Sequence, residues 1–318
     1  MGLRLTVRRD AWHAHVAAVA ASLPGLVPVV KGNGYGFGRG ILAPIAAELA
    51  SDIAVGTVYE IGEVPASCTP TVLTPHLGQL PADLPPTAIL TVAHAADVDA
   101  LAAQGWSGHV TIKLHSSMRR YGAAPDELPA LSAAIHAAGL TPRSYAIHLP
   151  LTGTQAEHLA EIEAWLPRLD PHLPLSVSHL DSDTYARLRD AHPARSFRIR
   201  VGTALWHGDK SLLHLGADVL DRHRVTAGVV GGYHATPAPA DGHLVMVAAG
   251  SAHGVRSLDD GRSPFHFMRQ RLALLEPPHM HTSILFVPDT QPCPAGGDVI
   301  DVQRPLIATT VDELIWID

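Results

Sequence analysis

The sequence has few cysteines and no excess of positive charge. Its 318 residues include two cysteines, Cys68 and Cys293, which excludes a disulfide scaffold and a zinc site built from several thiolates. The formal net charge of −7 argues against a nucleic-acid-binding protein, because such proteins neutralise phosphates with a basic surface. A chain of this length can form one large domain or two ordinary ones, each with a buried core.

The sequence also lacks a long apolar run. The most apolar stretch covers residues 16–30, and Pro24 and Pro28 interrupt it, whereas a membrane-spanning helix needs about 20 apolar residues. The N-terminus lacks the apolar region of a secretory signal. Together with two single thiols, these features predict a cytoplasmic protein that binds neither membranes nor nucleic acids.

Lysine is scarce in this chain. Lys31, Lys113 and Lys210 are the only lysines among 23 basic residues, and the others are arginines. A reaction that needs an amine nucleophile therefore has three possible positions, since a guanidinium does not deprotonate and cannot take its place.

Residues 11 to about 210 alternate between short β-branched runs and Ala/Leu-rich helical stretches. This pattern predicts a (β/α)8 barrel of the TIM type, and a doubly wound sheet is the alternative. The expected strands start near residues 26, 53, 71, 88, 110, 144, 175 and 197. The expected helices cover residues 11–23, 41–50, 95–104, 127–138, 156–166 and 183–190, with a weakly marked helix between residues 74 and 88.

The character of the sequence changes after residue 210. Strand-like segments at residues 225–231, 244–249, 283–287 and 299–302 are separated by turns rich in glycine and proline. We therefore expect a barrel over residues 1–210 and a smaller C-terminal β domain over residues 211–318. Ligand sites favour domain junctions and the carboxyl ends of barrel strands.

Lys31 ends the first expected barrel strand and precedes a glycine-rich loop, Gly32-Asn-Gly-Tyr-Gly-Phe-Gly-Arg-Gly40. An amine at the carboxyl end of a buried strand points into the barrel mouth, where a lowered pKa would make it nucleophilic. That is the requirement for a Schiff base with an aldehyde cofactor. The glycines let the backbone approach a ligand, and Tyr35 adds a hydroxyl at that edge. The same spacing also fits a flexible loop with a surface lysine.

The segment Val29–Gly38 resembles the pyridoxal phosphate lysine motif of the alanine racemase family, which are fold-type III pyridoxal phosphate enzymes. Further segments match the family in order over nearly the whole chain. The resemblance implies a barrel followed by a β domain, and pyridoxal 5'-phosphate bound to Lys31. It also implies an isomerase that racemises a small α-amino acid to a D-amino acid, and a homodimer that shares its site.

The resemblance also assigns roles to residues in the other matching segments. Ile112–Gly122 resembles the segment with a supporting lysine, carbamylated in some members, and a downstream arginine, here Lys113 and Arg120. Arg200–Gly208 resembles the segment whose arginine hydrogen-bonds the pyridine nitrogen. A permanently charged guanidinium leaves that nitrogen largely unprotonated, which restrains electron delocalisation and favours proton exchange at Cα. His148 is expected to face the cofactor ring, Tyr35, Ser178, Gly202 and Thr203 to hold phosphate, and Arg120 and Met280 to place the substrate carboxylate.

The second base of the family has no obvious counterpart. Family members use a tyrosine of the partner subunit in a Gly-Tyr-Ala-Asp-Gly stretch, and the matching segment here has Ser251 at the tyrosine position and His253 at the aspartate position. A serine hydroxyl is too weakly acidic to replace tyrosine near neutral pH. Because imidazole titrates near neutrality, we hypothesise that His253 of a partner subunit serves the opposite face of the substrate.

Other departures leave alternative functions open. His115 and His281 also stand where the family has aspartates, which indicates a reshaped pocket, and no metal site is expected. The chain ends at Asp318, earlier than is usual for the family, so the segment with a phosphate-contacting tyrosine has no counterpart. One alternative is a one-base pyridoxal phosphate enzyme, decarboxylase-like or aldolase-like, with Cys293 in the β domain. The other is a non-catalytic paralogue that binds the cofactor.

Overall fold

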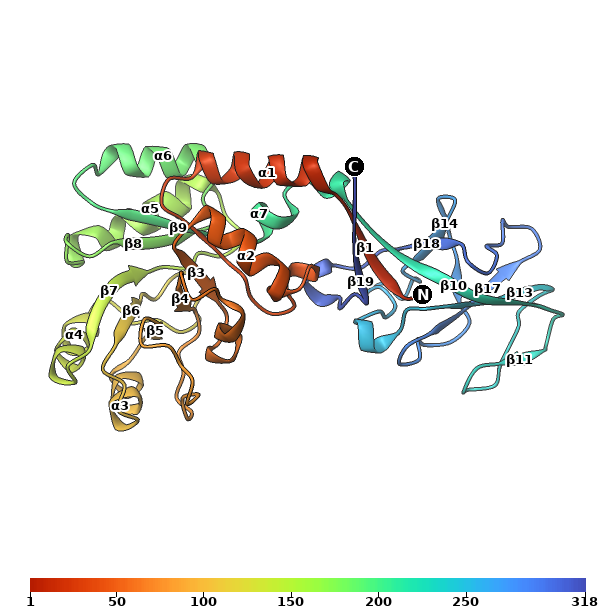
Figure 1. The fold of residues 1–318 in the computed structure, drawn as a ribbon, viewed down its shortest axis with the longest axis horizontal. Helices are drawn as coiled ribbons and strands as arrows, with labels where there is room; N and C mark the ends of the chain where they lie inside the picture. Colours follow the sequence, from red (N-terminus) through yellow and green to blue (C-terminus); the bar gives the residue numbers. More distant parts are fainter. The chain divides into compact units, whose positions relative to one another are not determined.

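The computed structural model describes all residues 1–318, in two compact units. The first, here called the barrel unit, consists of residues 15–34 and 39–208. The second, here called the β unit, consists of residues 1–14, 35–38 and 209–318. Figure 1 labels the helices and strands of both units. No helix is long and apolar enough to cross a membrane.

The barrel unit contains one sheet of eight parallel strands in the order β2-β9-β8-β7-β6-β5-β4-β3. Its two ends meet where Val29 forms a parallel bridge with Ala54, and the Val30 N–H donates to the Ala54 carbonyl over 2.8 Å. The predicted (β/α)8 barrel is therefore confirmed. The strands are β2 (Leu26–Pro28), β3 (Asp52–Val55), β4 (Thr69–Val72), β5 (Ile89–Val92), β6 (His109–Lys113), β7 (Thr141–Ala146), β8 (Leu175–Ser178) and β9 (Phe197–Val201).

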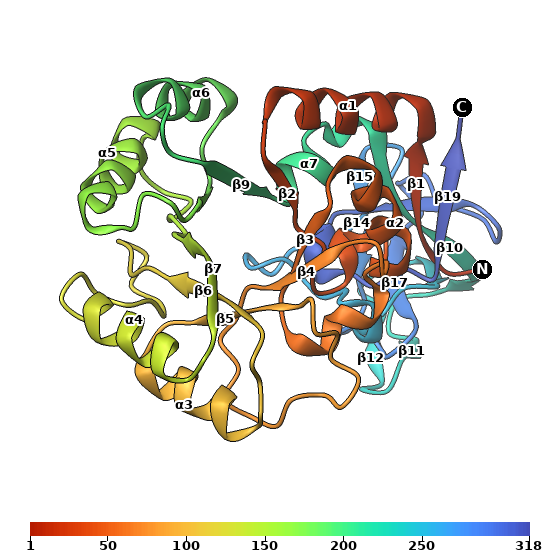
Figure 2. The same ribbon diagram turned by 60° about the vertical axis from the view of Figure 1, so that its left-hand side comes forward.

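Helices surround most of these strands, as Figure 2 shows for the helices that follow β5 to β8. Side-chain caps fix several helix starts; Thr154 accepts from the Glu157 N–H while the Glu157 carboxylate accepts from the Thr154 N–H. Strands between such helices and the barrel interior are covered on both faces, so all four residues of β5 and of β8 are buried. The helices are α1 (Arg9–Ser22), α2 (Arg39–Leu49), α3 (Ala95–Ala103), α4 (Leu128–Ala137), α5 (Gln155–Trp165), α6 (Ser182–Ala191) and α7 (Thr203–His207).

The weakly marked helix between residues 74 and 88 was a wrong prediction. This segment contains no helix, and the β3–β4 connection contains just a short 3-10 helix, η2 (Val58–Glu63). No helix forms between residues 74 and 88 because the segment contains four prolines, Pro75, Pro81, Pro85 and Pro86. Proline lacks the N–H that an α-helix needs and clashes with the preceding turn.

The β unit is built around β10 (Leu213–Val225), a strand of 13 residues. β10 pairs antiparallel with β13 (Gly242–Val247), β18 (Val299–Val302) and β1 (Leu3–Arg8). β17 (Ser283–Pro288) pairs with β13, and β19 (Glu313–Ile317) pairs parallel with β1. The short strands are β11 (Val230–Gly231), β12 (Thr236–Pro237), β14 (Phe265–Phe267), β15 (Gln270–Arg271) and β16 (Ala273–Leu274). The core of the unit contains Val245, Val247, Phe265, Leu285 and Ile300.

The N-terminal residues differ from the expected domain division, which placed residues 1–210 in the barrel. Alternate residues of β1, Leu3, Leu5 and Val7, are fully buried, and the strand pairs with β10 and β19, so residues 1–14 belong to the β unit. The predicted strand at 225–231 is also corrected, because β10 ends at Val225 and a turn with Gly228 in the left-handed region (φ +84°) precedes β11.

Candidate active site

Loops at the carboxyl ends of barrel strands contain strained backbone. Tyr35 (φ 56°) follows β2, Arg119 (φ 51°) follows β6 and His179 (φ 62°) follows β8, all in the left-handed region. This conformation costs a non-glycine residue about 1–2 kcal/mol, so the surroundings must hold it in place. The strain and the barrel topology both indicate that the functional site lies at this end of the barrel.

The loop after Lys31 depends on glycine. Gly32 and Gly34 have φ angles of 60° and 62°, and a Cβ added to Gly34 would lie 2.4 Å from the Arg39 amide nitrogen. Two carboxylates of η2 hold this loop. Glu60 accepts from the Gly32 N–H over 3.2 Å, and Glu63 pairs with Arg39, which in turn donates to the Gly32 carbonyl. Residues of η2 therefore hold the loop that directly follows Lys31.

The Lys31 side chain is accessible to solvent, as an amine that reacts with a ligand must be. Desolvation by the surrounding protein atoms lowers its pKa, and the positive charges of Arg120 and Arg200 lower it further, while Glu60 opposes them. A lowered pKa leaves more of the amine neutral near pH 7. Neutral amine is the nucleophilic and proton-accepting form.

Arg200, the next predicted site residue, is buried at 6% exposure near the end of β9. Its Nη1 donates to the Ser176 carbonyl over 2.8 Å and to Ser176 Oγ over 2.6 Å, and its Nη2 donates to the Ile147 carbonyl over 2.5 Å. Burial lowers its pKa to about 10, so the guanidinium remains charged at neutral pH. Its acceptors on β8 and beyond β7 fix where this charge lies.

Lys113 is also buried, at 5% exposure, where β6 ends. Desolvation, followed by the charges of Arg200, Arg120 and Lys31, holds its pKa well below the usual lysine value. None of these four cations forms an ion pair with a carboxylate. This part of the barrel therefore has positive charge that no ion pair neutralises, which suits an anionic ligand.

His148 and Ser178 lie together, as His148 Nδ1 is 2.8 Å from Ser178 Oγ. The His148 ring also packs against His179, with ring centroids 4.7 Å apart. Desolvation, followed by the charges of Arg200 and Lys113, lowers the pKa of His148 to about 2. His148 is therefore a neutral imidazole at physiological pH, and the 2% exposed Ser178 hydroxyl is held in place by it.

The remaining predicted residues of the barrel unit follow β6 and β9. Arg120 stacks on the Tyr121 ring, with its guanidinium 4.6 Å from the ring centroid. Gly202 immediately precedes α7 and its carbonyl accepts from the N–H groups of Leu205 and Trp206, both over 3.0 Å, while Thr203 is the exposed first residue of the helix.

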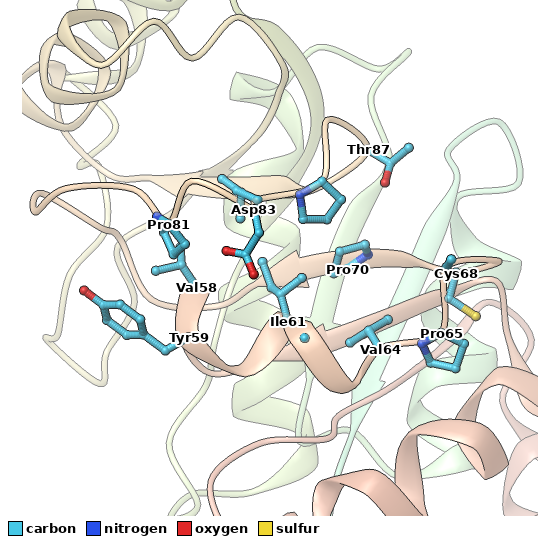
Figure 3. Close-up of a pocket in the computed structure, with 14 residues that line it drawn as sticks. Val58, Tyr59, Ile61, Val64, Pro65, Cys68, Pro70, Pro81, Asp83 and Thr87 are labelled. Atoms are coloured by element: carbon cyan, nitrogen blue, oxygen red, sulfur yellow. The ribbon is translucent and has the colours of Figure 1, made fainter.

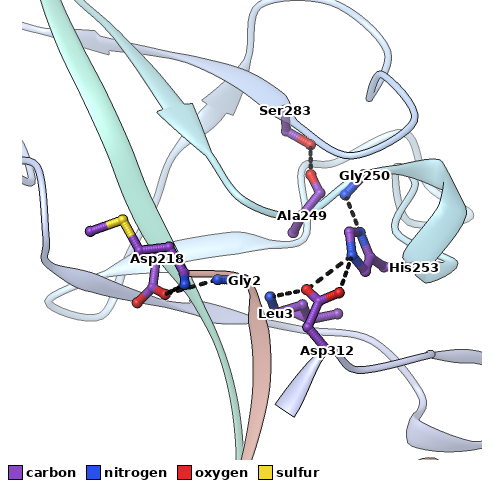
Figure 4. Close-up of polar contacts among 9 residues, drawn as sticks. Gly2, Leu3, Asp218, Ala249, Gly250, His253, Ser283 and Asp312 are labelled. Atoms are coloured by element: carbon purple, nitrogen blue, oxygen red, sulfur yellow. Dashed lines mark hydrogen bonds and ion pairs between the residues drawn. The ribbon is translucent and has the colours of Figure 1, made fainter.

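Tyr35, Met280 and His253 belong to the β unit. Tyr35 is 6% exposed and Met280 is 68% exposed. His253 is buried at 7% exposure, and both of its ring nitrogens are engaged, as Figure 4 shows. Nδ1 accepts from the Gly250 N–H over 3.0 Å, and Nε2 donates to Asp312, 3.1 Å away. Neither nitrogen is free to take a proton from a substrate, so this geometry counts against the hypothesis that His253 is the second base.

The sequence did not point to several residues that hold the site. Glu60, Glu63 and Arg39 fix the Lys31 loop, and Ser176 fixes Arg200. Glu161 of α5 accepts from the N–H and hydroxyl of Ser117, both over 2.6 Å, and so anchors the loop that contains Arg120. Apart from Arg39, which is seven residues from Gly32, these residues are 24 or more residues from their partners, and no short motif joins them. The nearest sequence signal was the capping pattern of Thr154 and Glu157, which marks the start of α5, the helix that contains Glu161.

Comparison with known proteins identifies the family of this chain. The family model for the alanine racemase N-terminal domain matches residues 7–210 of this chain. The chain belongs to the alanine racemase family. The resemblance drawn from the Lys31 and Arg200 motifs is thereby confirmed at the level of the family.

Individual members of the alanine racemase family show the extent of the similarity. The chain is 26% identical to an alanine racemase of Nitratidesulfovibrio vulgaris, over 99% of this chain and 93% of that protein. The crystal structure of alanine racemase from Bartonella henselae with covalently bound pyridoxal phosphate has a TM-score of 0.74 at 18% identity, and covers all of both chains. Biosynthetic alanine racemase from Pseudomonas aeruginosa gives a TM-score of 0.70 at 20% identity, over 100% of this chain and 99% of that one. These likenesses confirm the fold, a barrel with an additional β domain.

The half-buried His148 gives a prediction about pH. Its depressed pKa should keep the ring neutral from pH 8 to pH 5, whereas an unperturbed histidine would titrate near a pKa of about 6.5. The unfolded chain takes up this proton as the pH falls below about 6.5 and the folded chain does not, so the free energy of unfolding decreases by up to about 1.4 kcal/mol per pH unit. NMR of the imidazole C–H groups checks this, with the His148 signal assigned from His148→Gln. A signal that moves with a midpoint near 6.5 would contradict it.

Proposed function

We propose that this chain is a pyridoxal phosphate-dependent racemase of a small α-amino acid. The observation that carries the proposal is the accessible Lys31 amine, whose pKa is lowered beside cations that have no carboxylate partner. Family membership supports the same reading. An amine of this kind suits an aldehyde cofactor, and the positive charge suits both a phosphate group and a substrate carboxylate.

The residues present fit this cofactor. Lys31 would bind it covalently, Arg200 would face the ring nitrogen and His148 the ring, while Tyr35, Ser178, Gly202 and Thr203 would hold the phosphate. Arg120 and Met280 would place the substrate carboxylate. Pyridoxal phosphate, when bound, supplies an aldehyde carbon and an electron-withdrawing ring that acidifies the Cα–H of an amino acid.

The protein side chains then control the proton. Arg200 remains charged and donates rather than accepts, so it provides no proton acceptor for a protonated ring nitrogen. His148 stays neutral, and so adds no further positive charge beside Arg200. Lys31, with its lowered pKa, takes a proton from one face of Cα and returns it.

The opposite face has no assigned base, and we propose that a homodimer supplies it across the shared site. Within the β unit, Ser251 is exposed, while His253 is held between Gly250 and Asp312. The engaged His253 favours one second candidate function, a one-base enzyme in which Lys31 alone exchanges the proton. Analytical ultracentrifugation tests the dimer.

Incubation in D₂O separates the two functions. The purified protein, supplied with pyridoxal phosphate, is incubated with L-alanine or L-serine, and the products are analysed by chiral chromatography with mass detection. A racemase is expected to give the D-enantiomer with deuterium at Cα. Deuterium in recovered L-amino acid without any D-enantiomer indicates one-base exchange. The absence of any exchange, with cofactor bound, would exclude both functions for these substrates.

His253→Ala tests the second base. If His253 were the base, its loss would lower the racemisation rate by about 10²–10⁴-fold. We expect little change in rate, since both nitrogens are engaged, and a loss of about 1–3 kcal/mol in the free energy of unfolding, because Asp312 and the Gly250 N–H lose a partner. Chiral assays and urea denaturation measure the two effects. His136→Ala, at an exposed position of α4 in the barrel unit, is the control.

A further inference from the structure

The barrel has a thin outer layer over β3 and β4. The β3–β4 connection contains η2 alone, and the β4–β5 connection contains no helix. A pocket of about 470 Å³ lies on this side of the barrel unit, as Figure 3 shows. Pro70 of β4 faces it, whereas the neighbouring Thr71 lines the barrel interior, so the pocket is on the outer face of the sheet.

The pocket is mostly apolar, and prolines stiffen its walls. Pro65, Pro70, Pro81 and Pro85 line it, and each has a backbone φ fixed by its ring. Val58, Ile61, Val64 and Leu84 are further apolar residues of its lining. The volume lies within the range of roughly 300–1,000 Å³ typical of small-molecule sites, and stiff walls reduce the entropy lost on binding.

The one charged residue that lines the pocket is acidic. Asp83 lies in the wall, and in Figure 3 its carboxylate points toward Val58 and Ile61. The carboxylate has no ion pair or hydrogen bond, and no lysine, arginine or histidine lines the pocket. Tyr59, which is 72% exposed, adds an aromatic ring at the edge. A carboxylate and an aromatic ring both attract a cation, and apolar walls favour an apolar body.

We propose that this pocket is a binding site for a small organic cation with an apolar body. It is separate from the residues assigned to the cofactor and does not depend on the proposed racemisation. Val58, Tyr59 and Ile61 of η2 line the pocket, while Glu60 and Glu63 of the same helix hold Gly32 and Arg39. A bound cation would therefore brace the element that fixes the Lys31 loop, which makes the site suitable for control of the lysine.

Binding is tested with benzyltrimethylammonium, which cannot react with pyridoxal phosphate, and with benzylsulfonate, which has the same apolar body and the opposite charge. The full chain supplied with cofactor is studied by isothermal titration calorimetry and by hydrogen exchange. We expect the cation to bind more tightly than the anion and to protect residues 58–68 and 81–87. Protection should extend to residues 32–34 through the Glu60–Gly32 hydrogen bond.

Asp83→Asn should weaken cation binding roughly two- to fivefold, the effect of a partly exposed charge pair, while Asp126→Asn, at an exposed position outside the pocket, should leave it unchanged. Equal binding of both probes, binding of neither, or unchanged affinity in Asp83→Asn would overturn the proposal. Protection confined to the pocket would overturn the link to the Lys31 loop. Binding is measured without turnover, so inactivity of the same preparation toward amino acids would count against the racemase proposal alone.

Discussion

Replacing Lys31 with alanine is expected to remove the visible absorbance of the protein-bound cofactor and to lower kcat/KM by roughly 10⁴-fold or more. The structure makes Lys31 the accessible amine of this region, since Lys113 is buried at 5% exposure. The same side chain is assigned both the covalent link and a proton transfer, so its loss removes two functions together. Absorbance spectra and a chiral assay with L-alanine measure the two losses separately.

Lys210→Ala is the matched control, because Lys210 is an exposed lysine in the short 3-10 helix Lys210–Leu212. It should retain the absorbance band and the rate. Circular dichroism of Lys31→Ala should match that of the unchanged protein, as an exposed side chain contributes little to packing. A Lys31→Ala protein that keeps both the absorbance band and turnover would exclude Lys31 as the cofactor lysine.

The barrel could be predicted from the sequence because its signals are local. Buried runs such as Ile53–Val55 and Leu175–Ser178 lie between helical stretches, and each expected strand start falls within three residues of an observed strand start. The β unit depends on pairing between distant segments. β1 pairs with β10 and β19 across more than 200 residues of chain, which no local periodicity reveals. This long-range pairing explains why residues 1–14 were assigned to the wrong unit.

The candidate site divides in the same way. Lys31 and Arg200 stand in motifs that specify a residue type at a strand end, so the sequence pointed to both. The partners that fix them, Glu60 and Ser176, come from other elements and are visible in the structure alone. The hypothesis about His253 used residue type and register, and could not account for the Asp312 carboxylate that holds the ring.

Trp206 connects packing to the site. It is fully buried in α7, four residues after Gly202, and its Nε1–H donates to the Val29 carbonyl over 2.8 Å. Val29 lies directly after β2 and two residues before Lys31, so this hydrogen bond fixes the backbone between the strand and the lysine. Trp206 thus joins the segment after Arg200 to the segment before Lys31.

Trp206→Ala is expected to lower the free energy of unfolding by about 3–5 kcal/mol, the usual cost of removing a buried aromatic side chain and leaving a cavity. Trp206→Phe retains most of the packing and removes the donor to Val29, so it should cost less, about 1–3 kcal/mol. Urea denaturation measures both. If packing dominates stability and the hydrogen bond positions Lys31, Trp206→Phe should weaken cofactor binding out of proportion to its small loss of stability. Equal destabilisation by the two variants would instead assign the energy to the hydrogen bond, and unchanged cofactor affinity in Trp206→Phe would show that Lys31 is positioned without it.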